Sequence, residues 1–388
     1  MRILSLCFFL IVYGSLSAQD SWEPQTSGTV ENLNSIYFFN GSTGFTAGNN
    51  ATLLKTVDGG SSWTPVSITA TSNFNQVYFK NNTDGFVLAQ DGKIFRSSNS
   101  GTNWTGQTIH NSGLNGVDFN GDNGIVVGDD GHAFTSSDGG INWTDKGSLG
   151  VFTLNDVQFI NDTLVVAVGA SGSIYKSINK GNTWIAVPSG TTSTLSGIDR
   201  YSSELLFICG TNGEIMSFNP FTDETTSHAS GLSTSWLKGI DCEAGADCYS
   251  PGTSKASLIY SNQSWISRSI DENVNLNDVS FVGDGVVYYC GIGGVIYKTT
   301  QGGYPISTEK ISSTSISIAP NPAKDFIAVK SPFVTGTIKI LDFTGKEIII
   351  TALSQPSQLI TIRELPKGAY LVVISSNEST FVKKLFKK

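Results

Sequence analysis

The sequence has few charged residues and no long apolar run beyond its first residues. Asp, Glu, Lys and Arg make up only 14% of the 388 residues. The longest apolar run, residues 3–12, is about half of the roughly 20 residues that a spanning helix needs. No later segment is more apolar. We therefore expect no transmembrane segment in the mature protein.

The amino-terminal run has the features of a secretory signal peptide. Arg2 supplies the positive charge, the apolar stretch follows it, and Ser15 to Ala18 supply small residues for cleavage. The sequence therefore predicts a signal peptide over residues 1–18. Export also places the remaining cysteines in a compartment that permits disulfides.

Basic residues are scarce in the main body of the chain. From residue 311 onward there are ten Lys or Arg and five Asp or Glu, a net charge of +5. The whole chain carries −8, so the preceding part carries −8 − 5 = −13. An acidic body argues against nucleic acid or anionic lipid as a partner.

Residues 20–304 also lack the 3.6-residue period of helices and show a longer repeat instead. A frame of the form Leu/Phe-Asn-x-Val/Ile-x-Phe, with drift in the fifth and sixth units, opens at starts 41, 40, 40, 41, 42 and 39 residues apart. The openings are Leu33–Phe38, Phe74–Phe79, Leu114–Phe119, Leu154–Phe159, Leu195–Arg200, Leu237–Cys242 and Leu276–Phe281. A period of about 40 residues with four strands is typical of a propeller blade. The fold class expected is all-β, a seven-bladed β-propeller over residues 20–304.

A second motif, Ser/Thr-x-Asp/Asn-x-Gly-x-x-Trp, recurs within the first four units. Asp or Asn bonds the backbone of its own turn, Gly supplies a positive φ, and Trp returns a large ring to the core. It resembles the Asp-box of sialidases and related propellers, which implies a structural hairpin. Its residues are Thr56, Asp58, Gly60 and Trp63; Asn99, Gly101 and Trp104; Asp138, Gly140 and Trp143; and Asn179, Gly181 and Trp184.

The last unit lacks a Trp where its outer strand begins, and the other end of the chain carries a spare one. Ser21-Trp22-Glu23-Pro24 resembles Ser62-Trp63-Thr64-Pro65. We therefore predict that residues of about 20–30 add the outer strand to the blade begun at Leu276. Such a strand seals the ring and removes two open sheet edges.

Four cysteines remain after the signal peptide, and two of them predict a disulfide. Cys242 and Cys248 align with Phe38 and Phe45, which lie on neighbouring strands of one hairpin. A disulfide between Cys242 and Cys248 is expected; the alternative is two free buried thiols. Cys209 and Cys290 align with each other two blades apart and are expected to be unpaired.

The composition changes after the repeats. Residues 305–315 are rich in Ser and Thr and are predicted to form a linker. Residues 316–388 show short strands between Gly, Pro and Asp turns, which predicts a small antiparallel β-sandwich. A β-sandwich at this position is either a domain with a role in export or an ordinary adhesive domain.

This tail resembles the C-terminal sorting domain of the type IX secretion pathway of Bacteroidetes. The resemblance is carried by Pro320-Asn321-Pro322 with Asp325, the turns Asp342 to Gly345 and Leu365 to Tyr370, and the terminal lysines. It implies that the type IX machinery is a partner and that the protein reaches the outer cell surface or the medium.

The repeats resemble two propeller families with different activities. Likeness to sialidases would require three converging arginines, but the propeller holds only Arg96, Arg200 and Arg268, and no carboxylate pair can be assigned as acid and nucleophile. The repeats also resemble propellers of the photosystem II assembly-factor type, which use an arginine-rich surface that this acidic body lacks. The resemblances therefore transfer the fold but no catalytic residues.

One local cluster is a candidate ligand site. Asp129, Asp130 and His132 lie in the turn between the second and third strands of unit three, and His110 lies in the loop entering that unit. Histidine with carboxylates suits a divalent metal or a sugar; the alternative is a hydrated acidic loop. The spacing Asp118-x-Asn120-x-Asp122 is that of a calcium loop, but the sixth position lacks Gly.

The sequence thus predicts an exported binding module, with a glycan or a protein as its ligand and no cofactor. A rigid ring presents variable loops without requiring chemistry. Two alternatives remain: a glycan-active enzyme that uses the face carrying these loops, and a structural protein of the envelope or matrix.

Overall fold

The computed structural model describes residues 22–302 and 317–388, except 244, 246, 262, 269, 271–273, 331–335, 343–345, 356 and 376–379. The described residues divide into two compact units, residues 22–302 and residues 317–388. The predicted signal peptide (1–18) and linker (305–315) lie outside the described residues. Among the described residues, no helix is long and apolar enough to cross a membrane.

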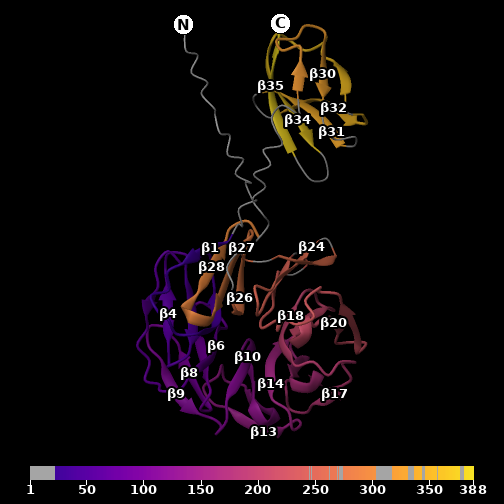
Figure 1. Ribbon diagram of the computed structural model, residues 1–388. Helices are drawn as coiled ribbons and strands as arrows, with labels where there is room; N and C mark the ends of the chain where they lie inside the picture. The colour runs from indigo at the N-terminus through magenta and orange to yellow at the C-terminus, as the bar shows by residue number, and fades with distance from the viewer. Residues whose placement is uncertain are drawn as a thin grey trace, which may run out of the picture. The chain divides into compact units, whose positions relative to one another are not determined.

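The first unit is a ring of four-stranded antiparallel sheets, the β-propeller that the repeats predict (Figure 1). Seven such sheets are formed by its described residues. The first three sheets are β2 (Leu33–Phe38), β3 (Gly44–Gly48), β4 (Leu53–Thr56), β5 (Thr64–Pro65); β6 (Phe74–Phe79), β7 (Gly85–Ala89), β8 (Lys93–Ser97), β9 (Thr105–Thr108); and β10 (Leu114–Asn120), β11 (Asn123–Gly128), β12 (His132–Ser136), β13 (Thr144–Ser148).

The next three sheets follow the same order from the innermost to the outermost strand. They are β14 (Leu154–Phe159), β15 (Val165–Gly169), β16 (Ile174–Ser177), β17 (Ile185–Val187); β18 (Leu195–Arg200), β19 (Leu206–Gly210), β20 (Ile215–Asn219), β21 (Glu224–His228); and β22 (Asp241–Cys242), β23 (Cys248–Pro251), β24 (Ser257–Ser261), β25 (Ser264–Ser267). Single 3-10 turns join second and third strands at Asp129–Gly131, Ala170–Gly172, Thr211–Gly213 and Ile292–Gly294.

The second strands carry the core of the ring. Every residue of β3, β7, β15 and β19 is buried, because each strand is covered by a neighbouring sheet on both faces. Phe45 of β3, for example, packs on Phe79 of β6 with ring centroids 4.8 Å apart. Burial of such rings is the main driving force for adjacent sheets to associate.

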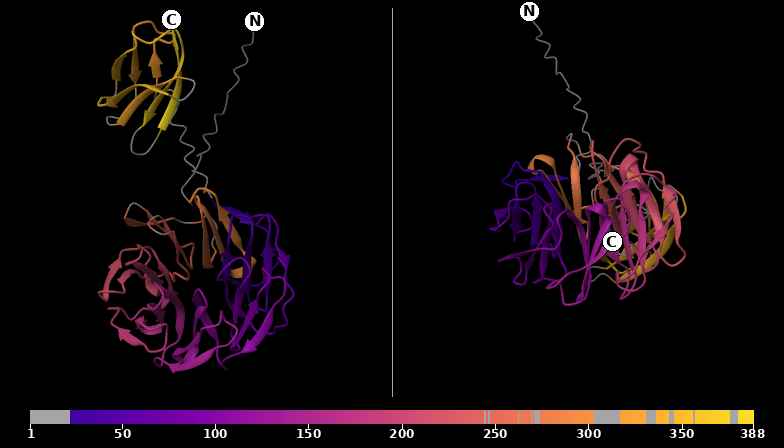
Figure 2. Two further views of the ribbon diagram at one scale, coloured as in Figure 1. Left: turned by 180° about the vertical axis from the view of Figure 1, so that it is seen from behind. Right: turned by 90° about the horizontal axis from the view of Figure 1, so that it is seen from below.

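The seventh sheet takes its outer strand from the other end of the chain. It contains β26 (Leu276–Gly283), β27 (Val286–Gly291), β28 (Ile296–Thr299) and β1 (Glu23–Gln25), with Pro24 opposite Tyr297. Trp22, only 7% exposed, stacks on Tyr289 with ring centroids 4.1 Å apart. Both ends of the ring therefore meet in one sheet, as the two views in Figure 2 show.

The sixth sheet departs from the predicted frame. The opening Leu237–Cys242 forms a regular strand only at Asp241–Cys242, and Leu237 makes an isolated bridge to Gly252. The innermost strand is correspondingly shorter than in the other sheets.

The Asp-box turns repeat one hydrogen-bond pattern in four sheets. In the third sheet, the Ser136 hydroxyl donates to Asp138 Oδ1 (2.8 Å), Gly140 N–H donates to Ser136 Oγ (2.9 Å), and Asn142 N–H donates to Asp138 Oδ1 (3.0 Å). The same bonds form around Thr56, Ser97 and Ser177. These bonds lower the pKa of Asp138 to about 2, so its carboxylate is a stable part of the turn.

The turn glycine also fits against the preceding sheet. Gly140 has a φ of +79°, and a Cβ there would lie 2.5 Å from the Phe86 ring of β7. Gly147, with a φ of +81°, has nothing within 4 Å of its Cβ position. The two glycines therefore share the left-handed backbone but differ in the space around them.

Gly140→Ala is expected to destabilise the propeller more than Gly147→Ala. Both replacements carry the cost of the left-handed conformation, about 1–2 kcal/mol. Only Gly140→Ala adds overpacking against Phe86, about 1–3 kcal/mol more. Urea unfolding followed by tryptophan fluorescence measures the difference, and equal losses for both variants would contradict the contact.

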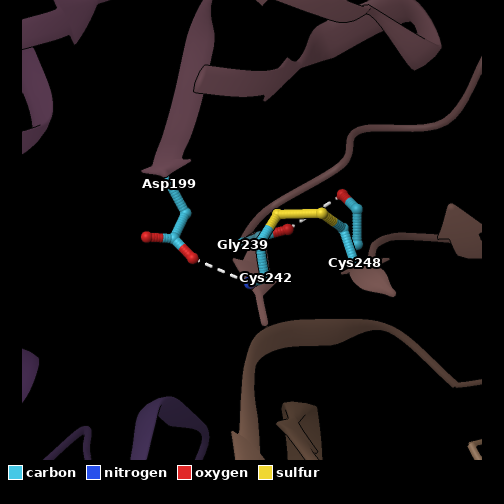
Figure 3. Close-up of a disulfide and its surroundings, with 5 residues drawn as sticks. Asp199, Gly239, Cys242 and Cys248 are labelled. Carbon is cyan, nitrogen blue, oxygen red and sulfur yellow. Dashed lines mark hydrogen bonds between the residues drawn. A yellow bond between two sulfur atoms is a disulfide. The ribbon is translucent and has the colours of Figure 1, made fainter. Parts of the chain in front are cut away.

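A disulfide crosslinks the first hairpin of the sixth sheet. Cys242 of β22 and Cys248 of β23 are paired in register and their sulfurs are bonded. Figure 3 shows the Asp199 carboxylate of the fifth sheet accepting the Cys242 N–H beside this bond (2.7 Å). Cys209 and Cys290 are buried free thiols. The covalent link holds the hairpin whose innermost strand is short.

The second unit contains two antiparallel sheets around one apolar core. One sheet has the order β29 (Ser317–Ala319), β30 (Phe326–Lys330), β33 (Ser357–Thr361); the other has β32 (Glu347–Leu353), β31 (Gly336–Leu341), β34 (Gly368–Ser375), β35 (Thr380–Lys387). Asn321 of the Pro-Asn-Pro motif donates to Lys384 O and accepts from Phe386 N–H (both 2.8 Å). The motif therefore anchors the basic final strand.

Candidate functional site

The innermost strands surround a polar hollow at the centre of the propeller. Its volume is about 260 Å³, and residues of all seven sheets line it. The third and fifth positions of the repeat frame face it, because alternation turns the frame's apolar residues outward into the sheets. Five of these side chains are carboxylates: Asp118, Asp156, Asp199, Asp241 and Asp278.

These side chains connect neighbouring sheets around the ring. Each junction between adjacent innermost strands has a side-chain oxygen that accepts a backbone N–H from the next strand. The acceptors, in order, are Ser35, Gln76, Asp118, Asp156, Asp199, Asp241 and Asp278, and the respective donors are Val77, Val117, Phe159, Ile198, Cys242, Phe281 and Ile36.

The Asn that recurs at the second position of the repeat frame adds a second set of hydrogen bonds between sheets. Asn75 Nδ2, for example, donates to Leu114 O of the next sheet at 3.0 Å. The equivalent donors at four other junctions are Asn34, Asn115, Asn155 and Asn277. The frame therefore encodes contacts between sheets as well as strands within them.

Burial changes the acidity of the hollow. It raises the pKa of Asp156 to about 8 and the pKa of Asp118 and Asp278 to about 6. Burial also raises the pKa of Asp199 and Asp241, the latter further because of the charge on Asp199. A carboxylate surrounded by protein and by other carboxylates is costly to ionise.

The second candidate site lies on the third sheet and differs from the predicted set. His110 and His132 come together, with ring centroids 4.3 Å apart. Their acidic neighbour is Asp145 of β13, whose Oδ1 lies 3.2 Å from His132 Nδ1. Asp129 instead accepts from Asn115 Nδ2 (3.0 Å), and Asp130 accepts from the Ser112 hydroxyl (2.8 Å).

An irregularity in strand pairing explains why Asp145 was missed. The register between β12 and β13 shifts between the pairs His132–Ser148 and Phe134–Asp145. Gly147 N–H donates to Asp145 Oδ1 at 2.7 Å, which turns the carboxylate toward the histidine. Regular strand pairing would not predict that Asp145 lies beside His132. In the sequence, Gly147 is the only local residue that indicates a β-bulge.

The remaining charged candidates serve separate local contacts. Arg96 pairs with Asp84 (2.7 Å), and Arg200 donates to Ile160 O (3.1 Å). Asp118, the first residue of the calcium-like spacing, is buried in the hollow, where Tyr78 and two backbone N–H groups bond it. These side chains do not form the arginine cluster of a sialidase.

Comparison with protein families matches each unit separately. Residues 317–388 match the secretion system C-terminal sorting domain. Residues 15–112 and 61–149 match the photosynthesis system II assembly factor YCF48 family. No curated protein matches the sequence.

Solved structures show the same fold at low sequence identity. YCF48 bound to D1 peptide is 18% identical with a TM-score of 0.60, covering 72% of this chain and 97% of that one. YCF48 from Cyanidioschyzon merolae is 16% identical with a TM-score of 0.59, covering 72% and 98%. PorZ, a surface component of the type IX secretion system of Porphyromonas gingivalis, is 9% identical with a TM-score of 0.57, covering 94% of this chain and 60% of that one.

Proposed function

Because residues 317–388 form a type IX sorting domain and the protein is delivered to the cell surface or outside, we propose that the propeller is an extracellular binding module. Residues 1–18 would start this route as the export signal. The ligand proposed is a segment of a partner protein that presents a Lys or Arg side chain to the central hollow.

The observation that carries this proposal is the set of five carboxylates that converge on one hollow. Lys238 is the one Lys or Arg among the lining residues, so carboxylates outnumber cations by five to one, and a concave acidic site attracts a positive charge. The acidic main body, with a net charge of −13 from −8 − 5, acts in the same direction at longer range. A similar propeller, YCF48, has been solved with a D1 peptide bound, which supports a peptide as a ligand for this fold.

Binding of a cation is expected to be linked to pH. A basic side chain favours the ionised carboxylates, so it must displace protons from groups such as Asp156, whose pKa is raised to about 8. Affinity for a lysine peptide should therefore increase from about pH 6 to about pH 8 and decrease with added salt.

A peptide series tests the proposal directly. Four labelled peptides that differ at one position, carrying Lys, Arg, norleucine or Glu, are compared by fluorescence polarisation at about pH 8. The Lys and Arg peptides should bind at least about tenfold more tightly, about 1.4 kcal/mol. Asp278→Asn should reduce this preference, whereas Asp130→Asn on the surface turn should not.

Equal binding of the Lys and norleucine peptides, or an unchanged preference in Asp278→Asn, would overturn the proposal. Tryptophan fluorescence confirms that each variant is folded. The pH and salt dependence of the unmodified protein gives a second measurement that needs no variant.

A glycan-active enzyme is the second candidate, because Asp156 with its raised pKa resembles a general acid. Both oxygens of Asp156, however, accept backbone N–H groups, from Val157 and Ile198. A panel of chromogenic glycosides separates the two functions: turnover that disappears in Asp156→Asn would favour the enzyme.

A further inference from the structure

We propose that His110, His132 and Asp145 form a binding site for a transition-metal ion, with Zn²⁺ as the ion that fits the donors best. The site lies on the third sheet and is independent of the hollow. One donor atom from each of these residues lies within 4.8 Å of the other two. The chain has three histidines, so two of them meet at this point.

The spacing of the donor atoms is close to that of a zinc site. Ligands about 2.0–2.1 Å from a tetrahedral Zn²⁺ are roughly 3.3 Å apart. His132 Nδ1 and Asp145 Oδ1 are 3.2 Å apart, so this edge needs no adjustment. The donor atom of His110 lies within 4.8 Å of the other two, so binding of the ion requires the His110 side chain to rotate toward them.

The surrounding structure holds the ligands in place. His110 N–H donates to Gly92 O at 3.2 Å, which fixes the loop between the second and third sheets. The Phe134 ring lies next to both imidazoles, with centroid distances of 5.4 Å to His110 and 6.1 Å to His132. Asp145 is held by its bond from Gly147 N–H. The ligands therefore come from three supported backbone segments.

The chemistry of the donors selects the class of ion. Two imidazoles and a carboxylate suit Zn²⁺ and other first-row transition metals, whereas Ca²⁺ and Mg²⁺ prefer oxygen ligands. The side chains of His132 and Asp145 are 23% and 48% exposed, so solvent reaches the site. Three protein ligands leave a coordination position for water or for a group of a partner.

The contact between the His110 and His132 imidazoles is not explained by the pairing of His132 with Asp145. Asp145 contacts His132, and a shared metal ion would join His110 to both.

Metal binding to the full, untagged protein tests the proposal. After EDTA treatment and dialysis, Zn²⁺ content is measured by equilibrium dialysis, and Co²⁺ is titrated to detect the absorption bands of a tetrahedral site. One Zn²⁺ should bind per chain, and excess Ca²⁺ or Mg²⁺ should not displace it. His110→Ala and His132→Ala should each weaken binding at least about tenfold.

The third histidine supplies the matched control. His228 contacts Ser217 on the fifth sheet, with Nε2 and Oγ 2.9 Å apart, so His228→Ala should leave the zinc stoichiometry and affinity unchanged. Absence of bound Zn²⁺ in the unmodified protein would overturn the proposal, as would unchanged affinity in His110→Ala or equal loss in His228→Ala. Variants that retain the tryptophan fluorescence of the folded protein exclude unfolding as the cause of a loss.

Discussion

Trp22→Ala is expected to lower the free energy of unfolding of the propeller by about 3–5 kcal/mol, the usual cost of truncating a buried Trp. Trp22 is 7% exposed and stacks on Tyr289 at a centroid distance of 4.1 Å. The loss should appear as a lower urea midpoint in tryptophan fluorescence. All seven tryptophans precede residue 266, so the signal reports on the propeller alone.

The expected loss of stability is large because the closing strand, β1, makes few other stabilising contacts. β1 has three residues, Glu23–Gln25, and pairs with β28 over the same length. Glu23 and Pro24 are exposed, so the strand contributes little apolar burial of its own. Trp22 therefore holds the strand in place. Its truncation removes the stacking contact with Tyr289 and also weakens the pairing of β1 with β28 that closes the propeller.

Trp236→Ala is the matched control for this experiment. The Trp236 side chain is 39% exposed, and its indole N–H donates to Ser196. Its truncation removes the same volume with less lost burial, so we expect a cost at least about 2 kcal/mol smaller than that of Trp22→Ala.

A loss for Trp22→Ala within about 1 kcal/mol of the Trp236→Ala loss would show that β1 does not hold the ring closed. A second readout follows from the edge that β1 covers. If β1 detaches, β28 presents unpaired N–H and C=O groups, and the variant should form oligomers in size-exclusion chromatography.

The sequence predicted the architecture because the repeats record it directly. The frame openings agree with β2, β6, β14 and β18 at both ends. A period near 40 residues leaves little choice other than a propeller blade. The second unit was likewise predictable as a small β-sandwich from short apolar strands between turn residues.

The hollow was not predicted, although its residues stand in the frame. Positions three and five vary among Ser, Gln, Asp, Tyr and Gly, so they carry no repeat signal of their own. One of these side chains at each junction accepts a backbone N–H from the next strand, and which one does so depends on how the sheets meet around the ring. Alternation within a strand indicates a face, but it does not show which backbone N–H lies opposite.

The site at His110 and His132 was likewise predicted in part from the sequence. The repeat pattern places His132 in a turn of the third unit and His110 in the loop that enters the same unit. Asp145 reaches them through a bulge, and Asp129 is bonded to Asn115 instead. A one-residue shift of register changes which side chain faces a site, and the sequence does not specify such a shift.

Lowering the pH from about 8 to about 5 is expected to stabilise the propeller, opposite to the usual acid destabilisation of salt-bridged proteins. Burial raises the folded-state pKa of Asp156 to about 8 and of Asp118 and Asp278 to about 6, from 3.8 in the unfolded chain. Between these values the folded state keeps protons that the unfolded state loses. Stability from these groups is therefore present in mild acid and is lost as pH rises through the folded pKa.

The free energy of unfolding should change steeply with pH because several carboxyl groups of the hollow contribute in the same direction. Each one that is protonated only in the folded state contributes up to about 1.4 kcal/mol per pH unit. Burial lowers the pKa of His228 and lowers the pKa of Lys238 to about 8, which favours the opposite slope, but these are two groups against five. Below the unfolded-state value of 3.8, the hydrogen-bonded Asp138 should begin to cost stability.

Urea midpoints at about pH 5, 6, 7 and 8 measure this slope, and Asp156→Asn tests its origin. The Asn side chain does not titrate, so the variant should flatten the dependence by up to about 1.4 kcal/mol per pH unit, whatever its absolute stability. Asp122→Asn is the control, because that side chain is 77% exposed and lies outside the hollow. A stability that is constant or rises from pH 5 to pH 8 would show that the five carboxylates of the hollow do not control the pH dependence of the free energy of unfolding.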